Sequence, residues 1–62
     1  MAAASFNHQL RLYEQAIAMA DAGTPRGAIV VLERLLPGVQ DPDLARSVRE
    51  LLLRLKAPLG AP

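Results

Sequence analysis

The chain contains no cysteine and a single histidine, His8, among its 62 residues. Disulfides are therefore excluded, and no structural zinc site is expected, because such sites take about four cysteine or histidine ligands. For one small domain of this length, burial of apolar surface contributes on the order of 90 kcal/mol, and ordering the chain costs about the same. We therefore expect a lone copy to be marginally stable and a protein partner to complete its stabilisation.

Aromatic residues and net charge are also scarce. Phe6 and Tyr13 are the two aromatic residues although 52% of the chain is hydrophobic, so the apolar mass is aliphatic, which suits helix packing. A formal net charge of +1 gives little attraction for nucleic acid or an anionic membrane. No apolar run is longer than residues 28–32, which is far shorter than the roughly 20 residues that span a bilayer. With no signal-peptide pattern in residues 1–5, we expect no nucleic-acid or membrane partner and a cytoplasmic location.

Helix-start and helix-end signals predict a single three-helix domain over residues 6–57, with helices at about 6–22, 25–36 and 42–57. Ser5 is the expected cap of the first helix, and Thr24 and Asp41, each followed by proline, are the expected caps of the others. Residues 1–5 are expected to be disordered. No segment has a convincing strand pattern, so the predicted fold class is all-α.

The sequence also contains clear signals for the end of each predicted helix. Gly23 is placed to end the first helix, the pair Pro37 and Gly38 to end the second, and Pro58 to end the third. Residues 58–62 are then expected to form a flexible tail.

Each predicted helix carries an apolar stripe at helical spacing. The stripes are Phe6, Leu10, Tyr13, Ala16, Ile17 and Ala20; Ala28, Ile29, Val31, Leu32, Leu35 and Leu36; and Leu44, Val48, Leu51, Leu52 and Leu55. The first stripe, extended by Leu12 and Met19, covers about half of its helix, so this helix is expected to contact two neighbours. Val30 and Leu53 depart from the pattern because each falls among charged residues.

Gly23 lies at the turn between the first two helices, and the small residue Ala28 lies near the start of the second. With Leu12, Ala16 and Met19 facing Ala28, Leu32 and Leu35, residues 9–42 resemble one tetratricopeptide repeat, a 34-residue helical hairpin. Met19 stands where that family usually has an aromatic residue, and the closing proline is displaced by about two residues, to Pro42. The resemblance implies a tetratricopeptide-like hairpin followed by a capping helix, 42–57.

The resemblance also implies a partner-binding role for Leu10, Tyr13 and Ile17, on the concave side of the first helix. The alternative is that these three residues pack against helix 42–57. Because about three such repeats are normally needed for a stable fold, the resemblance again favours a partner. Val30 and Leu53 are the other candidate contacts with a second chain.

The function we expect is a small protein–protein interaction or assembly module, either a homo-oligomer or an accessory subunit of a larger protein. The alternative is a helix-turn-helix DNA-binding protein, since residues 19–32 contain a turn glycine followed by a helix, although that helix offers few polar groups to a DNA groove. No catalytic set, phosphate-binding loop or metal-ligand cluster is present, so no enzyme activity or cofactor is expected. We also expect no small-molecule substrate, because so short a chain should enclose no cavity of sufficient size.

Overall fold

The structure, a computed structural model, describes residues 5–60, with side chains for residues 5–57. Over this range it contains α1 (Phe6–Asp21), α2 (Pro25–Leu35), a 3₁₀ turn η1 (Leu36–Gly38) and α3 (Pro42–Gly60), and no strand. The predicted all-α fold with three helices is therefore confirmed. Of residues 1–5, predicted to be disordered, residues 1–4 lie outside the described part of the chain, whereas Ser5 is described and caps α1. Of the predicted tail, 58–62, residues 61–62 also lie outside it.

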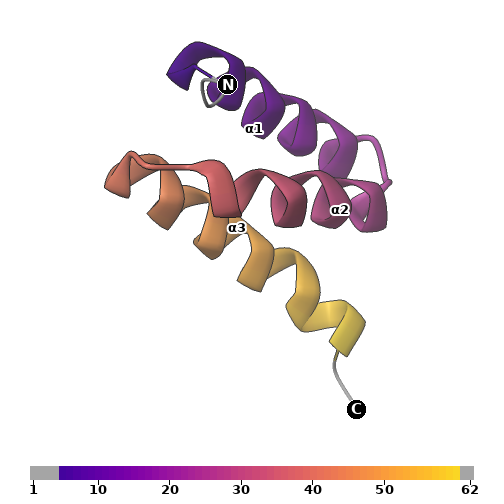
Figure 1. The fold of residues 1–62 in the computed structure, drawn as a ribbon. Helices are drawn as coiled ribbons and strands as arrows, with labels where there is room; N and C mark the ends of the chain where they lie inside the picture. The colour runs from indigo at the N-terminus through magenta and orange to yellow at the C-terminus, as the bar shows by residue number, and fades with distance from the viewer. Residues whose placement is uncertain (1–4, 61–62) are drawn as a thin grey trace.

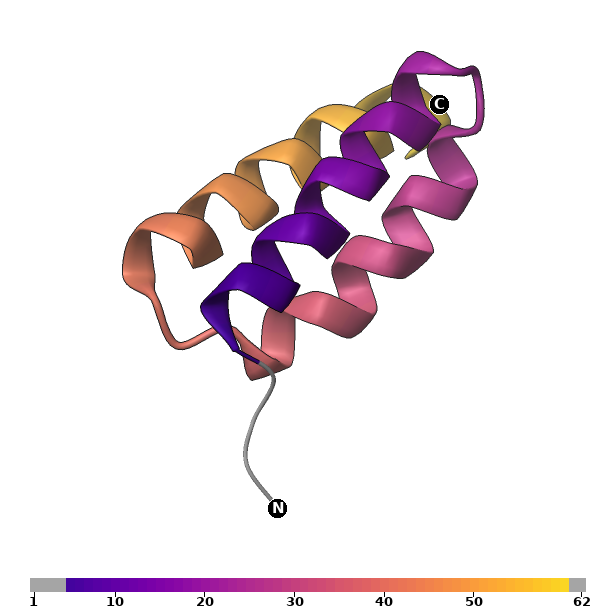
Figure 2. The same ribbon diagram turned by 90° about the horizontal axis from the view of Figure 1, so that it is seen from above.

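The three helices lie side by side. α1 and α2 form an antiparallel hairpin, and α3 packs mainly on α2 while running in the same direction as α1 (Figures 1 and 2). The first half of α3 lies close to the hairpin, whereas its C-terminal end diverges from it (Figure 1). α1 contacts both other helices, as its wide apolar arc predicted.

Two of the predicted side-chain caps are confirmed. The Ser5 hydroxyl oxygen accepts a hydrogen bond from the amide of His8 at 3.2 Å, and Asp41 Oδ2 accepts one from the amide of Leu44 at 2.8 Å. Each bond satisfies an amide in the first helical turn that has no partner within the helix. Local sequence therefore determines where α1 and α3 begin.

Gly23 ends α1 by a left-handed turn, with φ at +90°. The amide of Thr24 donates to the carbonyl of Met19 at 2.8 Å, and the amide of Gly23 donates to the carbonyl of Ala20 at 3.1 Å. These two bonds form the Schellman arrangement that closes many helices. Glycine adopts this conformation at little cost because it has no Cβ, so the predicted helix end is confirmed within one residue.

The predicted hydroxyl cap at Thr24 is wrong. Thr24 does precede α2, but its side chain makes no capping hydrogen bond, and its ψ is 60° rather than the 158° of the capping residue Ser5. The Thr24 side chain lies instead close to Gly27: its Cγ2 methyl is 3.2 Å from the point that a Cβ on this glycine would occupy. Because the Schellman turn already holds the Thr24 backbone, this residue does not adopt the extended geometry of a cap.

The predicted end of the third helix is also wrong. α3 continues past Ala57 and Pro58 to Gly60, so residues 58–60 belong to the helix rather than to a tail. Proline lacks an amide hydrogen, which removes one bond to the carbonyl of Arg54, and a proline ring crowds the carbonyl four residues before it. Close to the end of a helix few further bonds depend on this one, and the backbone continues for two residues. By contrast, Pro37 and Gly38 do end α2, in the turn η1.

Seven hydrophobic side chains form the buried core, and all of them were predicted to face inward. They are Ala16, Ala28, Leu32, Leu35, Leu44, Val48 and Leu52. Phe6, also predicted on the apolar face of α1, is 49% exposed. The reason is its position in the first turn of α1: Gln9, one turn later, already meets η1, so Phe6 lies beyond the end of the hairpin.

Gln9 is the one buried polar side chain among the described residues, at 6% exposure. Its Nε2 donates a hydrogen bond of 2.8 Å to the carbonyl of Gly38, which ties the start of α1 to η1. Sequence reasoning assigned Gln9 no role, because amide side chains on helices are mostly exposed. The available signal was its spacing, since Gln9 lies three and seven residues before Leu12 and Ala16 on the same helix face.

Replacing Gln9 with alanine is expected to lower the free energy of unfolding by about 1–3 kcal/mol, because the Gly38 carbonyl loses its partner in a partly buried site. Urea denaturation followed by circular dichroism measures this change. The matched control is Gln15→Ala on the exposed side of α1, expected to change stability by about 0.5 kcal/mol or less. Equal losses in the two variants would show that the Gln9 bond does not hold α1 to η1.

Candidate protein-interaction surfaces

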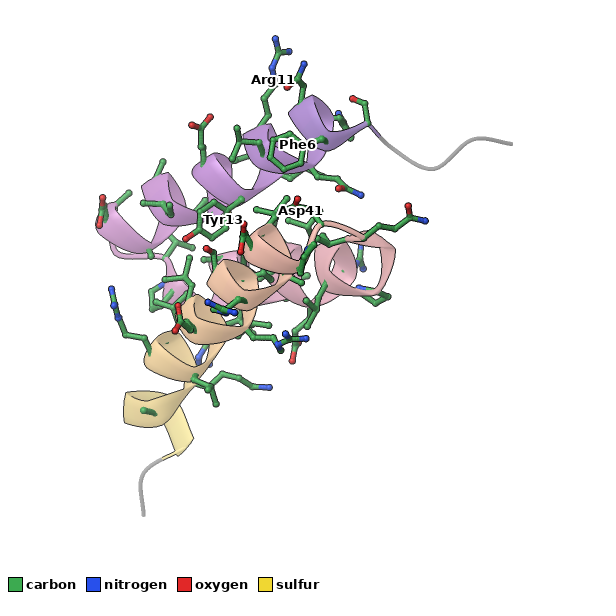
Figure 3. The ribbon with its side chains drawn as sticks, turned by 90° about the vertical axis from the view of Figure 1, so that its left-hand side faces the viewer. Phe6, Arg11, Tyr13 and Asp41 are labelled. Carbon is green, nitrogen blue, oxygen red and sulfur yellow. The ribbon has the colours of Figure 1, made fainter. Side chains whose placement is uncertain are left out.

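The first candidate surface is the side of α1 that carries the predicted residues Leu10, Tyr13 and Ile17, all half-buried. Leu10 and Tyr13 pack against the core cluster. Tyr13 projects from α1 toward α3 (Figure 3) and shares a small hollow with Ser47, Glu50, Leu51 and Arg54. Ile17 does not join the hydrophobic residues packed on the core, and it lies toward the end where α3 diverges. The alternative, in which these residues pack against the third helix, therefore holds for Tyr13. The side chain of Ile17 is only half-buried and is not covered in this way.

The second candidate surface is a groove between α1 and α2 that sequence reasoning missed. Its volume is about 410 Å³, and its lining is His8, Gln9, Leu12, Val31, Arg34, Leu35 and Gly38. That volume lies within the roughly 300–1,000 Å³ of typical small-molecule sites, but the groove is open to solvent and is not the enclosed cavity to which the sequence-based expectation refers. Two of its lining residues, Gln9 and Gly38, are 29 positions apart and joined by a hydrogen bond, so the groove has no local sequence signal.

The third candidate surface contains the two predicted contact residues that violate the helical pattern. Val30 is 48% exposed on α2 and Leu53 is 71% exposed on α3, as their places among charged residues predicted. Lys56 Nζ lies 2.8 Å from Glu33 Oε2 and links the two helices. Val30 lies three residues before Glu33, and Leu53 three residues before Lys56. Residues so spaced are neighbours on a helix, so both hydrophobic side chains lie one turn from the same ion pair.

We call this surface the α2–α3 face and define it by two triplets with the same spacing, Arg26, Val30 and Glu33 on α2 and Arg49, Leu53 and Lys56 on α3. Members of each triplet are four and then three residues apart, which aligns them along one side of a helix. A hollow of about 250 Å³ adjoins it, lined by Arg49, Leu52, Leu53 and Lys56. The face therefore combines exposed apolar side chains, a recess beside one of them and a charged surround.

The charges on the α2–α3 face are mostly positive. Arg26, Arg49 and Lys56 supply three cations, and Glu33 supplies the single carboxylate, which Lys56 already contacts. Both members of this ion pair are about half exposed, at 53% and 49%, so the pair contributes little to stability. Its geometric meaning is that the last residue of one triplet contacts the last residue of the other, with the two triplets running in opposite directions along the antiparallel helices (Figure 1).

Among the described residues, no group of three or more His, Asp or Glu side chains is placed to hold a metal ion. None of the described helices combines the length and the apolar character needed to cross a membrane. Comparison with known proteins gives no match to a family model, to a curated protein or to a solved structure. The interpretation of these surfaces therefore depends on their own chemistry.

Proposed function

We propose that this chain is a small protein–protein interaction or assembly module that acts through the apolar faces of its helices, by self-association or as an accessory subunit. Leu53, 71% exposed, is the observation that supports this most directly. Full burial of a leucine side chain stabilises by roughly 1.5–3 kcal/mol. Single exposed hydrophobic residues are common, but Leu53 lies beside a hollow and shares its face with Val30.

The small core supports the same proposal. Of the seven buried hydrophobic residues, two are alanines, and Leu32 and Val48 are the largest that are fully buried. Chains of this size usually gain stability from disulfides, a metal or a partner, and this chain has no cysteine. Contact with a second chain would bury the exposed hydrophobic side chains that the three helices leave uncovered.

We also infer that α1 and α2 form one tetratricopeptide-like unit with α3 as its cap. The left-handed turn at Gly23 and the complete burial of Ala16 and Ala28 support this inference. In this arrangement Leu10, Tyr13 and Ile17 belong to the binding side, and Ile17 is the one of the three that does not pack on the core.

Replacing Leu53 with aspartate is expected to abolish association while leaving the helical content unchanged, because the side chain touches a partner rather than the core. Sedimentation velocity over about a hundredfold concentration range, alone and with candidate partner proteins, measures association. Ala18→Asp is the control: it adds the same charge at an exposed position of α1 and should associate like the unmodified chain. A chain that stays monomeric throughout, with a concentration-independent melting temperature and no partner binding, would contradict the proposal.

A further inference from the structure

The charge pattern of the α2–α3 face indicates the kind of partner that fits it, given the interaction function proposed above. Each exposed aliphatic side chain has an arginine four residues before it: Arg26 precedes Val30, and Arg49 precedes Leu53. Among residues 5–57 the one ion pair joins Lys56 and Glu33, so neither arginine has a carboxylate partner within 4 Å. The surface therefore offers two apolar contact points, each with an adjacent cation.

The hollow beside Leu53 specifies a further contact. It measures about 250 Å³ and is lined by two leucines, Leu52 and Leu53, and by two cationic residues, Arg49 and Lys56. This arrangement suits one large aliphatic or aromatic side chain whose neighbours carry negative charge. An amphipathic helix supplies such groups together, because its apolar residues and the acidic residues three or four positions away lie on adjoining parts of its surface.

Other partners fit the α2–α3 face less well. A second copy docking through the same face would bring a surface with three cations and one carboxylate against an identical surface, and this repulsion between like charges opposes association. Single-stranded nucleic acid uses aromatic side chains for stacking, and this face has none. A membrane surface would engage the cations, but two aliphatic side chains on separate helices give a smaller apolar contact than the continuous face of an interfacial helix.

We propose that the α2–α3 face binds an acidic amphipathic helix of a different protein. An apolar side chain of that helix enters the hollow beside Leu53, a second covers Val30, and carboxylates contact Arg26 and Arg49. Because these charge contacts lie at an exposed surface, binding weakens as the salt concentration rises.

The test uses the full chain, labelled with ¹⁵N, and two synthetic helical peptides of equal length with identical leucine positions. One peptide carries glutamate beside the leucines and the other carries lysine. The glutamate peptide is expected to shift amide resonances of residues 26–33 and 49–56 and to bind at least about tenfold more tightly than the lysine peptide, a difference of about 1.4 kcal/mol. Vesicles containing anionic phosphatidylglycerol are tested in parallel by co-sedimentation.

Two substitutions separate the charge contribution from the apolar one. Arg49→Glu is expected to weaken binding of the glutamate peptide about tenfold or more and to strengthen binding of the lysine peptide. Arg11→Glu is the matched control, because Arg11 is exposed and points away from α2 and α3 (Figure 3). Leu53→Ser is expected to remove binding of the glutamate peptide.

Equal binding of the two peptides, no binding of either, or shifts confined to the α1–α2 groove would overturn the inference. Vesicle binding that Arg49→Glu abolishes, in the absence of peptide binding, would assign the face to a lipid surface instead. A further outcome separates this inference from the proposed function. If Leu53→Asp loses its association in sedimentation but the unmodified chain binds neither peptide, the interaction function is supported and the acidic helix is rejected as its partner.

Discussion

Leu32→Ala is expected to leave only a small folded population at room temperature. Leu32 is one of the two largest fully buried side chains, at 0% exposure, and it lies on α2, to which both α1 and α3 make most of their interhelical contacts. Truncating a buried leucine to alanine costs about 2–5 kcal/mol, because it removes apolar contacts and leaves a cavity. A core of this size rarely supplies more than about 3–5 kcal/mol, so the substitution removes most of the available stability.

Urea denaturation of Leu32→Ala, followed by circular dichroism, measures this loss. The control applies the same change to a leucine at the surface: Leu53→Ala, at 71% exposure, is expected to alter the free energy of unfolding by about 0.5 kcal/mol or less. Both variants are studied at low concentration, so that association does not contribute. Similar losses in the two variants would show that the helices do not pack around Leu32 as described.

Val48→Asp is expected to detach α3 from the hairpin and to prevent stable folding. Val48 is fully buried, and among the described residues no cationic side chain is buried beside it to pair with a new carboxylate. Burial of an unpaired charge costs several kcal/mol, which exceeds the stability expected of so small a core. The variant should therefore show no cooperative thermal transition.

Val30→Asp tests whether the effect of Val48→Asp comes from burial. The two substitutions are chemically identical, but Val30 is 48% exposed, so its new carboxylate remains in water. Val30→Asp should keep a cooperative transition with its midpoint changed by a few degrees. If Val48→Asp melted like Val30→Asp, the assignment of Val48 to the buried core would be wrong.

The helices and core could be predicted because their signals are local. Ser5 and Asp41 cap helices through bonds to residues three positions away, and the stripe that contains Leu44, Val48 and Leu52 needs only the helical period. The same local reasoning failed at Thr24, whose backbone the preceding turn holds. It also failed at Pro58, where the position near the helix end reduces the effect of a proline.

The features that could not be predicted join distant parts of the chain. Gln9 looks like an ordinary surface amide until α1 and η1 are placed together, and the groove beside it then follows. The exposure of Val30 and Leu53 was predicted residue by residue. The ion pair between Glu33 and Lys56, 23 positions apart, was not, because the register between α2 and α3 depends on packing. For the same reason, the sequence alone could not predict that the residues of the α2–α3 face belong to one surface.

Because Tyr13 lies between α1 and α3, its intrinsic fluorescence reports on the contact between these two helices. Tyr13 is the single tyrosine in a chain without tryptophan, so almost all intrinsic fluorescence excited near 280 nm comes from this ring, where α3 meets α1. Emission and its quenching by iodide therefore follow the docking of the third helix, while far-ultraviolet dichroism follows helix content. Divergence of the two signals during unfolding would reveal α3 leaving before the hairpin opens, with no label attached.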